Sequence, residues 1–118
     1  MHGTWGHPGD WAWGTPCLQQ RSIEVRAVDL PLHRVYGASL QDDAAHVLQV
    51  AARCPAPVAL VGWSYGGRVI TVAGHGADPR TTALVYVSAL PEQLGQVNDT
   101  RWVTRTHGAM CCPTAGTC

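Results

Sequence analysis

The sequence has 118 residues, enough for one small domain, with 46% hydrophobic residues, 14% charged residues and a formal net charge of zero. The low charged fraction excludes a disordered chain, and the lack of a basic block argues against nucleic acid or an anionic membrane as a partner. The sequence contains neither an apolar run as long as a membrane span nor the basic and apolar regions of a signal peptide, so we expect a cytoplasmic protein.

The first third of the chain predicts a loop, a short helix and a strand. Residues 1–14 are rich in glycine and tryptophan and are predicted to form a loop. Thr15 followed by Pro16 is typical of a helix start, and this helix is expected to stop near Ser22. Residues 23–31, IEVRAVDLP, alternate between apolar and polar side chains, which predicts a strand.

A longer helix is predicted after Ser39. Ser39 is expected to be its N-cap, because Asp42 follows three residues later as the partner of a capping box. Apolar residues then recur at intervals of three and four, which gives the helix one apolar face. They are Ala44, Val47, Leu48, Ala51 and Ala52. Pro55 ends the pattern.

The remaining elements alternate between strand and helix. Residues 57–62, PVALVG, and 82–90, TALVYVSAL, are short continuous apolar runs, which predict strands buried on both faces. Residues 68–75 between them predict a helix. This alternation predicts an α/β fold with a mostly parallel sheet flanked by helices. No periodicity continues beyond Val97, so we expect a core over residues 1–96 and an irregular tail over residues 97–118.

The short motif Gly62-Trp63-Ser64-Tyr65-Gly66 carries the clearest chemical signal. A serine between a buried strand and an apolar helix stands at the tip of a sharp turn, and glycines two residues on either side let the strand and helix approach closely. The helix N-terminus then faces the oxygen that becomes negative during acyl transfer. We interpret the motif as a nucleophile elbow with Ser64 as the catalytic nucleophile.

A phosphate-binding loop is the alternative for these glycines. Gly62 and Gly67 have the required spacing, but Arg68 and Val69 stand where that loop needs lysine and then serine or threonine. The five cysteines of the chain include no C-x-x-C pair, and no histidine pair completes a zinc set, so we expect free thiols and no metal or cofactor.

Four separated motifs resemble the α/β-hydrolase superfamily, in particular its small esterase-like branch. They are HGTWG, AVDLP, ALVGWSYGGRVI and LVYVSALP, and together they span about residues 2–96. The resemblance implies that Ser64 is the nucleophile and that the backbone N–H groups of Tyr65 and Thr4 form the oxyanion hole. It implies that His2 and Gly3 shape and support the loop that carries Thr4.

The sequence departs from the superfamily pattern at both ends. In the superfamily a buried strand precedes the His-Gly loop, and here Met1 stands in its place. The triad acid and histidine follow later strands, and too few residues remain after Leu90 for two further strand–helix units. Asp29 is not at the position of the acid, and His107 is the one histidine in the pattern-free tail. We therefore expect a hydrolase fragment truncated at both ends.

The function expected from the sequence is hydrolysis of carboxylic esters or related acyl bonds, with little or no activity in this chain alone. Two alternatives remain open. The chain is a non-enzymatic remnant or interaction module, or it is one half of a hydrolase that a second chain complements. Unpaired sheet edges would favour self-association in either case.

Overall fold

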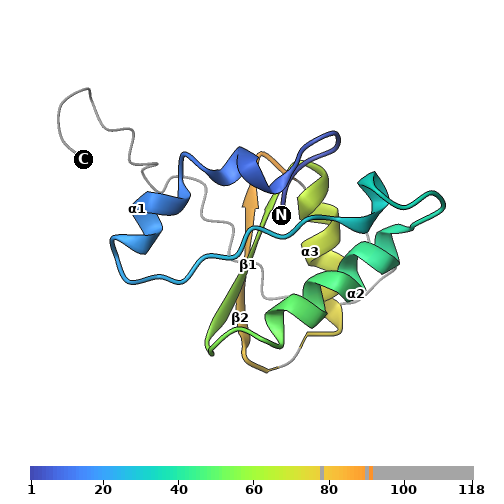
Figure 1. Ribbon diagram of the computed structural model, residues 1–118. Helices are drawn as coiled ribbons and strands as arrows, with labels where there is room; N and C mark the ends of the chain where they lie inside the picture. Colours follow the sequence, from blue (N-terminus) through green and yellow to red (C-terminus); the bar gives the residue numbers. More distant parts are fainter. Residues whose placement is uncertain (78, 90, 92–118) are drawn as a thin grey trace.

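The computed structural model describes residues 1–77, 79–89 and 91, and Figure 1 shows their arrangement. In chain order the elements are η1 (Pro8–Trp11), α1 (Thr15–Gln19), η2 (Pro31–His33), α2 (Leu40–Ala51), β1 (Val58–Trp63), α3 (Tyr65–His75) and β2 (Thr81–Val87). The expected core of residues 1–96 extends beyond these residues, and the expected tail of residues 97–118 lies outside them.

The two strands form a parallel sheet. Leu60 pairs with Leu84 and Trp63 with Val87, and an irregularity follows Val58. Figure 1 shows α2 and α3 together on one side of the strands, with α1 on the other side. The predicted α/β architecture of parallel strands flanked by helices is confirmed.

Local sequence signals explain where the helices begin. Ser39 is the N-cap of α2 and exchanges hydrogen bonds with Asp42 in the predicted capping box. α3 begins directly after Ser64, three residues earlier than the apolar pattern indicated, and ends at His75 as predicted. A 3-10 turn at Pro8–Trp11 interrupts the predicted N-terminal loop and is capped by the side chain of His7.

The core lies between α2, α3 and the inner face of the sheet. It also contains residues from the N-terminal segment and from the chain before η2. Its buried apolar residues are Met1, Val28, Leu30, Ala44, Val47, Leu60, Val69, Ile70 and Ala73. Burial of these side chains is the main favourable contribution to the stability of this part of the chain.

The predicted strand over residues 23–31 is wrong. Residues 23–30 have no regular secondary structure, and Pro31 begins η2. Val28 and Leu30 still reach the core, so the apolar side of the alternating pattern is used. A strand also needs a hydrogen-bonded neighbour, and the described part of the chain places no paired strand beside this segment.

The prediction that both strands are buried on both faces is also wrong for the described residues. Leu60 and Gly62 of β1 face α3 and are buried, whereas Ala59 and Trp63 point to the opposite face and are exposed. Ala83 and Val85 continue this exposed face on β2. The continuous apolar run thus predicted the strands correctly, but α2 and α3 cover one face of them only.

The first residue of the chain extends the sheet. The Met1 amino group donates to the carbonyl oxygen of Val61 at 2.6 Å, and the Met1 carbonyl accepts from the Trp63 N–H at 3.1 Å. This is the hydrogen-bond pattern of a parallel ladder, on the edge of β1 opposite β2. Met1 thereby places the loop that follows it at the carboxyl end of β1.

Candidate active site

Ser64 lies at the junction between β1 and α3. Its backbone has φ 51° and ψ −118°, a combination that a non-glycine residue rarely adopts and that costs on the order of 1–3 kcal/mol. The Ser64 N–H donates to Val87 at 3.2 Å and its carbonyl accepts from Gly67 at 2.9 Å. The end of the sheet and the first turn of α3 therefore hold the strained residue from both sides.

The two elbow glycines sit where no side chain would fit. A Cβ on Gly62 would collide with the backbone oxygen of Gly66. A Cβ on Gly66 would lie 2.7 Å from the Met1 carbonyl oxygen and 2.8 Å from that of His2. These close approaches bring β1, α3 and the N-terminal segment together around Ser64, and they account for the glycine spacing of the motif.

The segment of Gly3 and Thr4 lies against the serine. A Cβ built on Gly3 would be 3.1 Å from Ser64 Cβ and 3.6 Å from Ser64 Oγ. Residues 3–6 form a β-turn in which the Gly6 N–H donates to the Gly3 carbonyl at 3.0 Å. Thr4 is the second residue of this turn. The structure therefore brings the Thr4 loop, Ser64 and the start of α3 together.

His2 is fully buried beside this turn, and backbone groups occupy both of its ring nitrogens. The Leu30 N–H donates to Nε2 at 3.2 Å, so Nε2 carries no proton. The proton is then on Nδ1, 3.0 Å from the Gly3 carbonyl oxygen, to which it donates. A ring engaged in this way suits the predicted role of supporting the loop, and it has no nitrogen left to accept a proton from Ser64.

Asp29 lies next to His2 and makes no hydrogen bond to Ser64 Oγ. One carboxylate oxygen is 3.7 Å from His2 Nε2, and the other forms an ion pair with Arg34. His2 and Arg34 thus hold the Asp29 carboxylate, and its exclusion as the triad acid stays a prediction.

Two residues at this end of the molecule were not singled out from the sequence. Asp43 is fully buried and accepts hydrogen bonds from the Tyr65 hydroxyl and from the Leu32 N–H, both at 2.8 Å. His33 accepts a hydrogen bond from the Trp5 N–H through Nε2 at 3.1 Å. The position of Asp43, three residues after Leu40 and four before Val47, placed it on the apolar face of the helix and could have revealed it.

Within the described residues, no side chain is placed to act as general base for Ser64. No hydrogen bond joins Ser64 Oγ to another described residue. His75 closes α3 and lies ten residues from Tyr65, or about 15 Å along the helix axis. His107 lies outside the described residues. No cluster of described residues could hold a metal ion.

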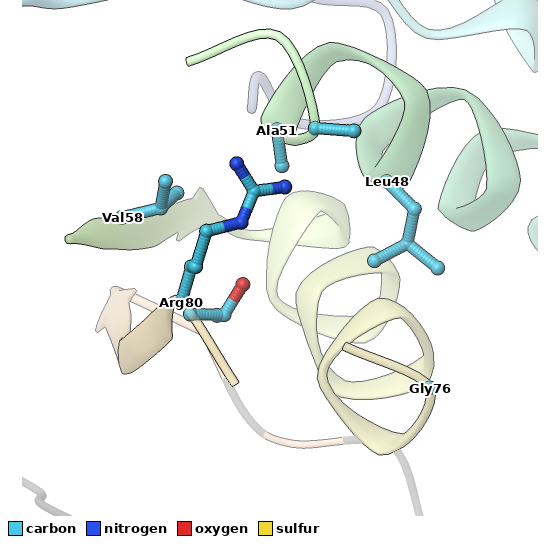
Figure 2. A pocket seen from close by; sticks show the side chains of 7 residues that line it. Leu48, Ala51, Val58, Gly76 and Arg80 are labelled. Carbon is cyan, nitrogen blue, oxygen red and sulfur yellow. The ribbon is translucent and has the colours of Figure 1, made fainter. Parts of the chain in front are cut away.

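A small cavity of about 130 Å³ lies at the other end of the sheet. Figure 2 shows it between the start of β1, the ends of α2 and α3, and the side chain of Arg80. Val58 on its wall is six residues from Ser64, which is about 20 Å along a strand. The cavity is mostly apolar and is separate from the serine turn.

A parallel strand followed by a strained serine and a helix defines an α/β protein with the backbone geometry of a nucleophile elbow. The model of the alpha/beta hydrolase family matches residues 1–111, and the chain belongs to this family. No curated protein and no solved structure gives a significant match. No helix among the described residues is both long and apolar enough to cross a lipid bilayer.

Proposed function

We propose that Ser64 is the nucleophile for hydrolysis of carboxylic esters or related acyl bonds. The observation that carries this proposal is the backbone of Ser64, at φ 51° and ψ −118° between β1 and α3. Strain of this kind persists only where the surrounding structure imposes it, and it is concentrated at functional sites. Membership of the alpha/beta hydrolase family supports the same assignment.

The proposed oxyanion hole consists of the backbone N–H groups of Tyr65 and Thr4. Tyr65 is the first residue of α3, where N–H groups have no carbonyl partner within the helix and where the helix dipole favours negative charge. Thr4 lies in the turn that approaches Ser64. Donors held in place before the reaction stabilise the developing oxyanion without further reorganisation.

The general base and its acid are proposed to be supplied by another chain, and His107, outside the described residues, is the alternative source that the labelling experiment distinguishes. A serine hydroxyl without a base is a weak nucleophile. Loss of the histidine in a serine hydrolase costs on the order of a million-fold in turnover. We therefore expect the purified 118-residue chain to show negligible labelling by a fluorophosphonate probe and no ester hydrolysis beyond that of Ser64→Ala.

Imidazole added to the solution tests the role of Ser64 directly, because it is a diffusible general base. The chain is incubated with the fluorophosphonate at increasing imidazole concentration, and the adduct is located by mass spectrometry. We expect labelling of Ser64 that rises with imidazole and is absent from Ser64→Ala. Ser22→Ala is the matched control, since Ser22 also has a positive φ of 59° and lies outside the elbow.

The proposal fails if the adduct forms equally in Ser64→Ala, or if imidazole produces no adduct on Ser64 while circular dichroism shows a folded chain. Strong labelling of Ser64 without imidazole would instead place the base within the 118 residues. The variant His107→Ala then identifies it, because this substitution should abolish the labelling.

An interaction module is the second candidate, and the exposed apolar face of the sheet favours it. Ala59 and Trp63 of β1 lie directly opposite Ala83 and Val87 of β2 on this face. Trp63 is 40% exposed and Val85 is 42% exposed. Such a surface can bind a protein partner, including one that supplies the catalytic base in trans.

A further inference from the structure

We infer that His33 is a positioning residue that holds the turn of residues 3–6 in its present conformation, and that it does so only while its ring is neutral. Only one part of the inference rests on the proposed function: that the turn serves to present the Thr4 N–H to Ser64. The conformational role of His33 follows from the contacts of the ring and of Trp5.

The turn contains a residue in an unfavourable conformation. Trp5 is the third residue of the β-turn and has φ 64°, while Thr4 has no positive φ. This combination of φ angles with the Gly6 to Gly3 hydrogen bond is the pattern of a type II turn, in which the third position strongly favours glycine. The tryptophan side chain is 91% exposed, so packing of the indole does not compensate for the strain.

The bond to His33 is the contact that favours this conformation. The Trp5 N–H donates to His33 Nε2 at 3.1 Å. A type I turn would relieve the positive φ of Trp5, but it requires the peptide between Thr4 and Trp5 to rotate. That rotation turns the Trp5 N–H away from His33. The hydrogen bond therefore opposes the relaxation of the loop that carries Thr4.

The ring of His33 is itself held in place by neighbouring elements. Its centroid is 5.1 Å from that of His2 and 6.0 Å from that of Tyr65, both in edge-on geometry. The backbone before it is fixed by the Leu32 N–H, which donates to Asp43. His33 thus connects the turn to η2, α2 and the first residue of α3.

The bond requires a neutral imidazole. Nε2 accepts from a backbone N–H, so the single proton of the ring is on Nδ1, which is buried and has no hydrogen-bond partner among the described residues. A second proton would place an N–H against the Trp5 N–H and abolish the bond. Protonation of the ring is therefore expected to release the turn.

The groups that face His33 come from several elements. They are His2 from the N-terminal segment, Tyr65 from α3 and Asp43 from α2, which reaches the ring through the Tyr65 hydroxyl. His2 is neutral by the argument from its own hydrogen bonds. The Asp29–Arg34 ion pair lies on the segment of His33 itself and carries no net charge.

Two variants of His33 distinguish the need for a hydrogen-bond acceptor at the position of Nε2 from the need for an imidazole ring. In His33→Gln the amide oxygen can reach the position of Nε2, whereas the shorter side chain of His33→Asn reaches only that of Nδ1. The readout is the amide signal of Trp5 in ¹H–¹⁵N spectra, with its hydrogen-exchange protection factor. We expect the wild type to lose the protection on acidification, and His33→Gln to keep it at every pH measured.

In His33→Asn the protection of the Trp5 amide should fall about tenfold at every pH, which corresponds to one hydrogen bond. The inference is overturned if the Trp5 amide is insensitive to pH in the wild type, or if the Gln and Asn variants behave alike. These signals do not depend on catalysis, so a failure of Ser64 chemistry leaves them unchanged.

The variant Trp5→Gly provides a second test through a double-mutant cycle, because glycine adopts a positive φ without strain. In this background the turn no longer needs His33. We expect His33→Asn to lower the midpoint of urea unfolding in the wild type and to lower it clearly less in Trp5→Gly. Equal shifts in the two backgrounds would show that His33 does not stabilise the strained turn.

Discussion

The amino group of Met1 combines a positive charge with a buried position. It donates to the Val61 carbonyl at 2.6 Å, and burial lowers its pKa from 8.0 to about 6. In the unfolded chain the same amine is solvated and retains its ordinary pKa. The pKa difference makes the stability of the 118-residue chain dependent on pH.

The sign of this dependence follows from proton binding. Between pH 6 and 8 the unfolded amine holds its proton while the folded amine has lost it, so the free energy of unfolding rises with pH in this window. The contribution is fully present above pH 8 and is lost as the pH falls through 6. A pKa difference of two units corresponds to about 2–3 kcal/mol.

Urea unfolding between pH 5.5 and 8.5 measures this change. N-terminal acetylation is the matched control, because it replaces the titrating amine with an amide that can still donate to Val61. We expect the acetylated chain to lose the part of the pH dependence that comes from Met1. Identical profiles for the free and acetylated chains would contradict the assignment.

Other features at the residue scale depend on contacts that no sequence pattern indicates. The pairing of Asp43 with the Tyr65 hydroxyl joins residues 22 positions apart. His33 meets Trp5 across 28 positions. The first contact arises because α2 packs against α3, and the second because the chain before η2 packs against the N-terminal segment, where the Leu30 N–H donates to His2.

At the scale of the elements, Gly66 and Gly74 of α3 lie against different kinds of neighbour. A Cβ on Gly66 would meet two backbone oxygens, those of Met1 and His2, at 2.7 and 2.8 Å. A Cβ on Gly74 would meet Leu84 Cδ1 at 2.6 Å, which is the end of a flexible side chain. The first neighbour cannot move without displacing the N-terminal segment, whereas the second can rotate.

We therefore expect Gly66→Ala to lower the free energy of unfolding by about 2–3 kcal/mol, because overpacking against backbone strains the structure. Gly74→Ala should change it by less than about 1 kcal/mol, since the higher helix propensity of alanine offsets the contact with Leu84. Urea unfolding of the two variants decides the point. Equal losses would mean that the N-terminal segment does not pack against the elbow as described.

At the scale of the whole molecule, the described residues cover one face of the sheet and leave the other face open. α2 and α3 cover the inward side chains of both strands, whereas the outward side chains are apolar and remain exposed. Parallel sheets are ordinarily covered on both faces. We expect the 118-residue chain to associate with itself, through this face or through an edge of the sheet.

Val85→Lys tests the contribution of the face. The substitution places a charge at its centre, at a residue that is 42% exposed, and we expect a lower apparent mass by light scattering across a concentration series. Thr82→Lys is the matched control, because Thr82 is exposed on the same strand outside the Ala59–Ala83 and Val61–Val85 pairs. A wild-type chain that stays monomeric at all concentrations would contradict the expectation. Association unaffected by Val85→Lys would point to the strand edge instead.

The sequence alone was sufficient for features that depend on neighbours in the chain. The capping box of α2, the two apolar strands, the helix after Ser64 and the family follow from short-range patterns and motif order. These patterns are reliable because propensity, capping and turn chemistry act over a few residues. Only the tertiary structure showed that residues 23–31, which alternate like a strand, have no strand to pair with in the described part of the chain. It also decided which side of the sheet is open and that Asp43, His33 and His2 converge near Ser64, because these outcomes depend on contacts between residues far apart in the chain.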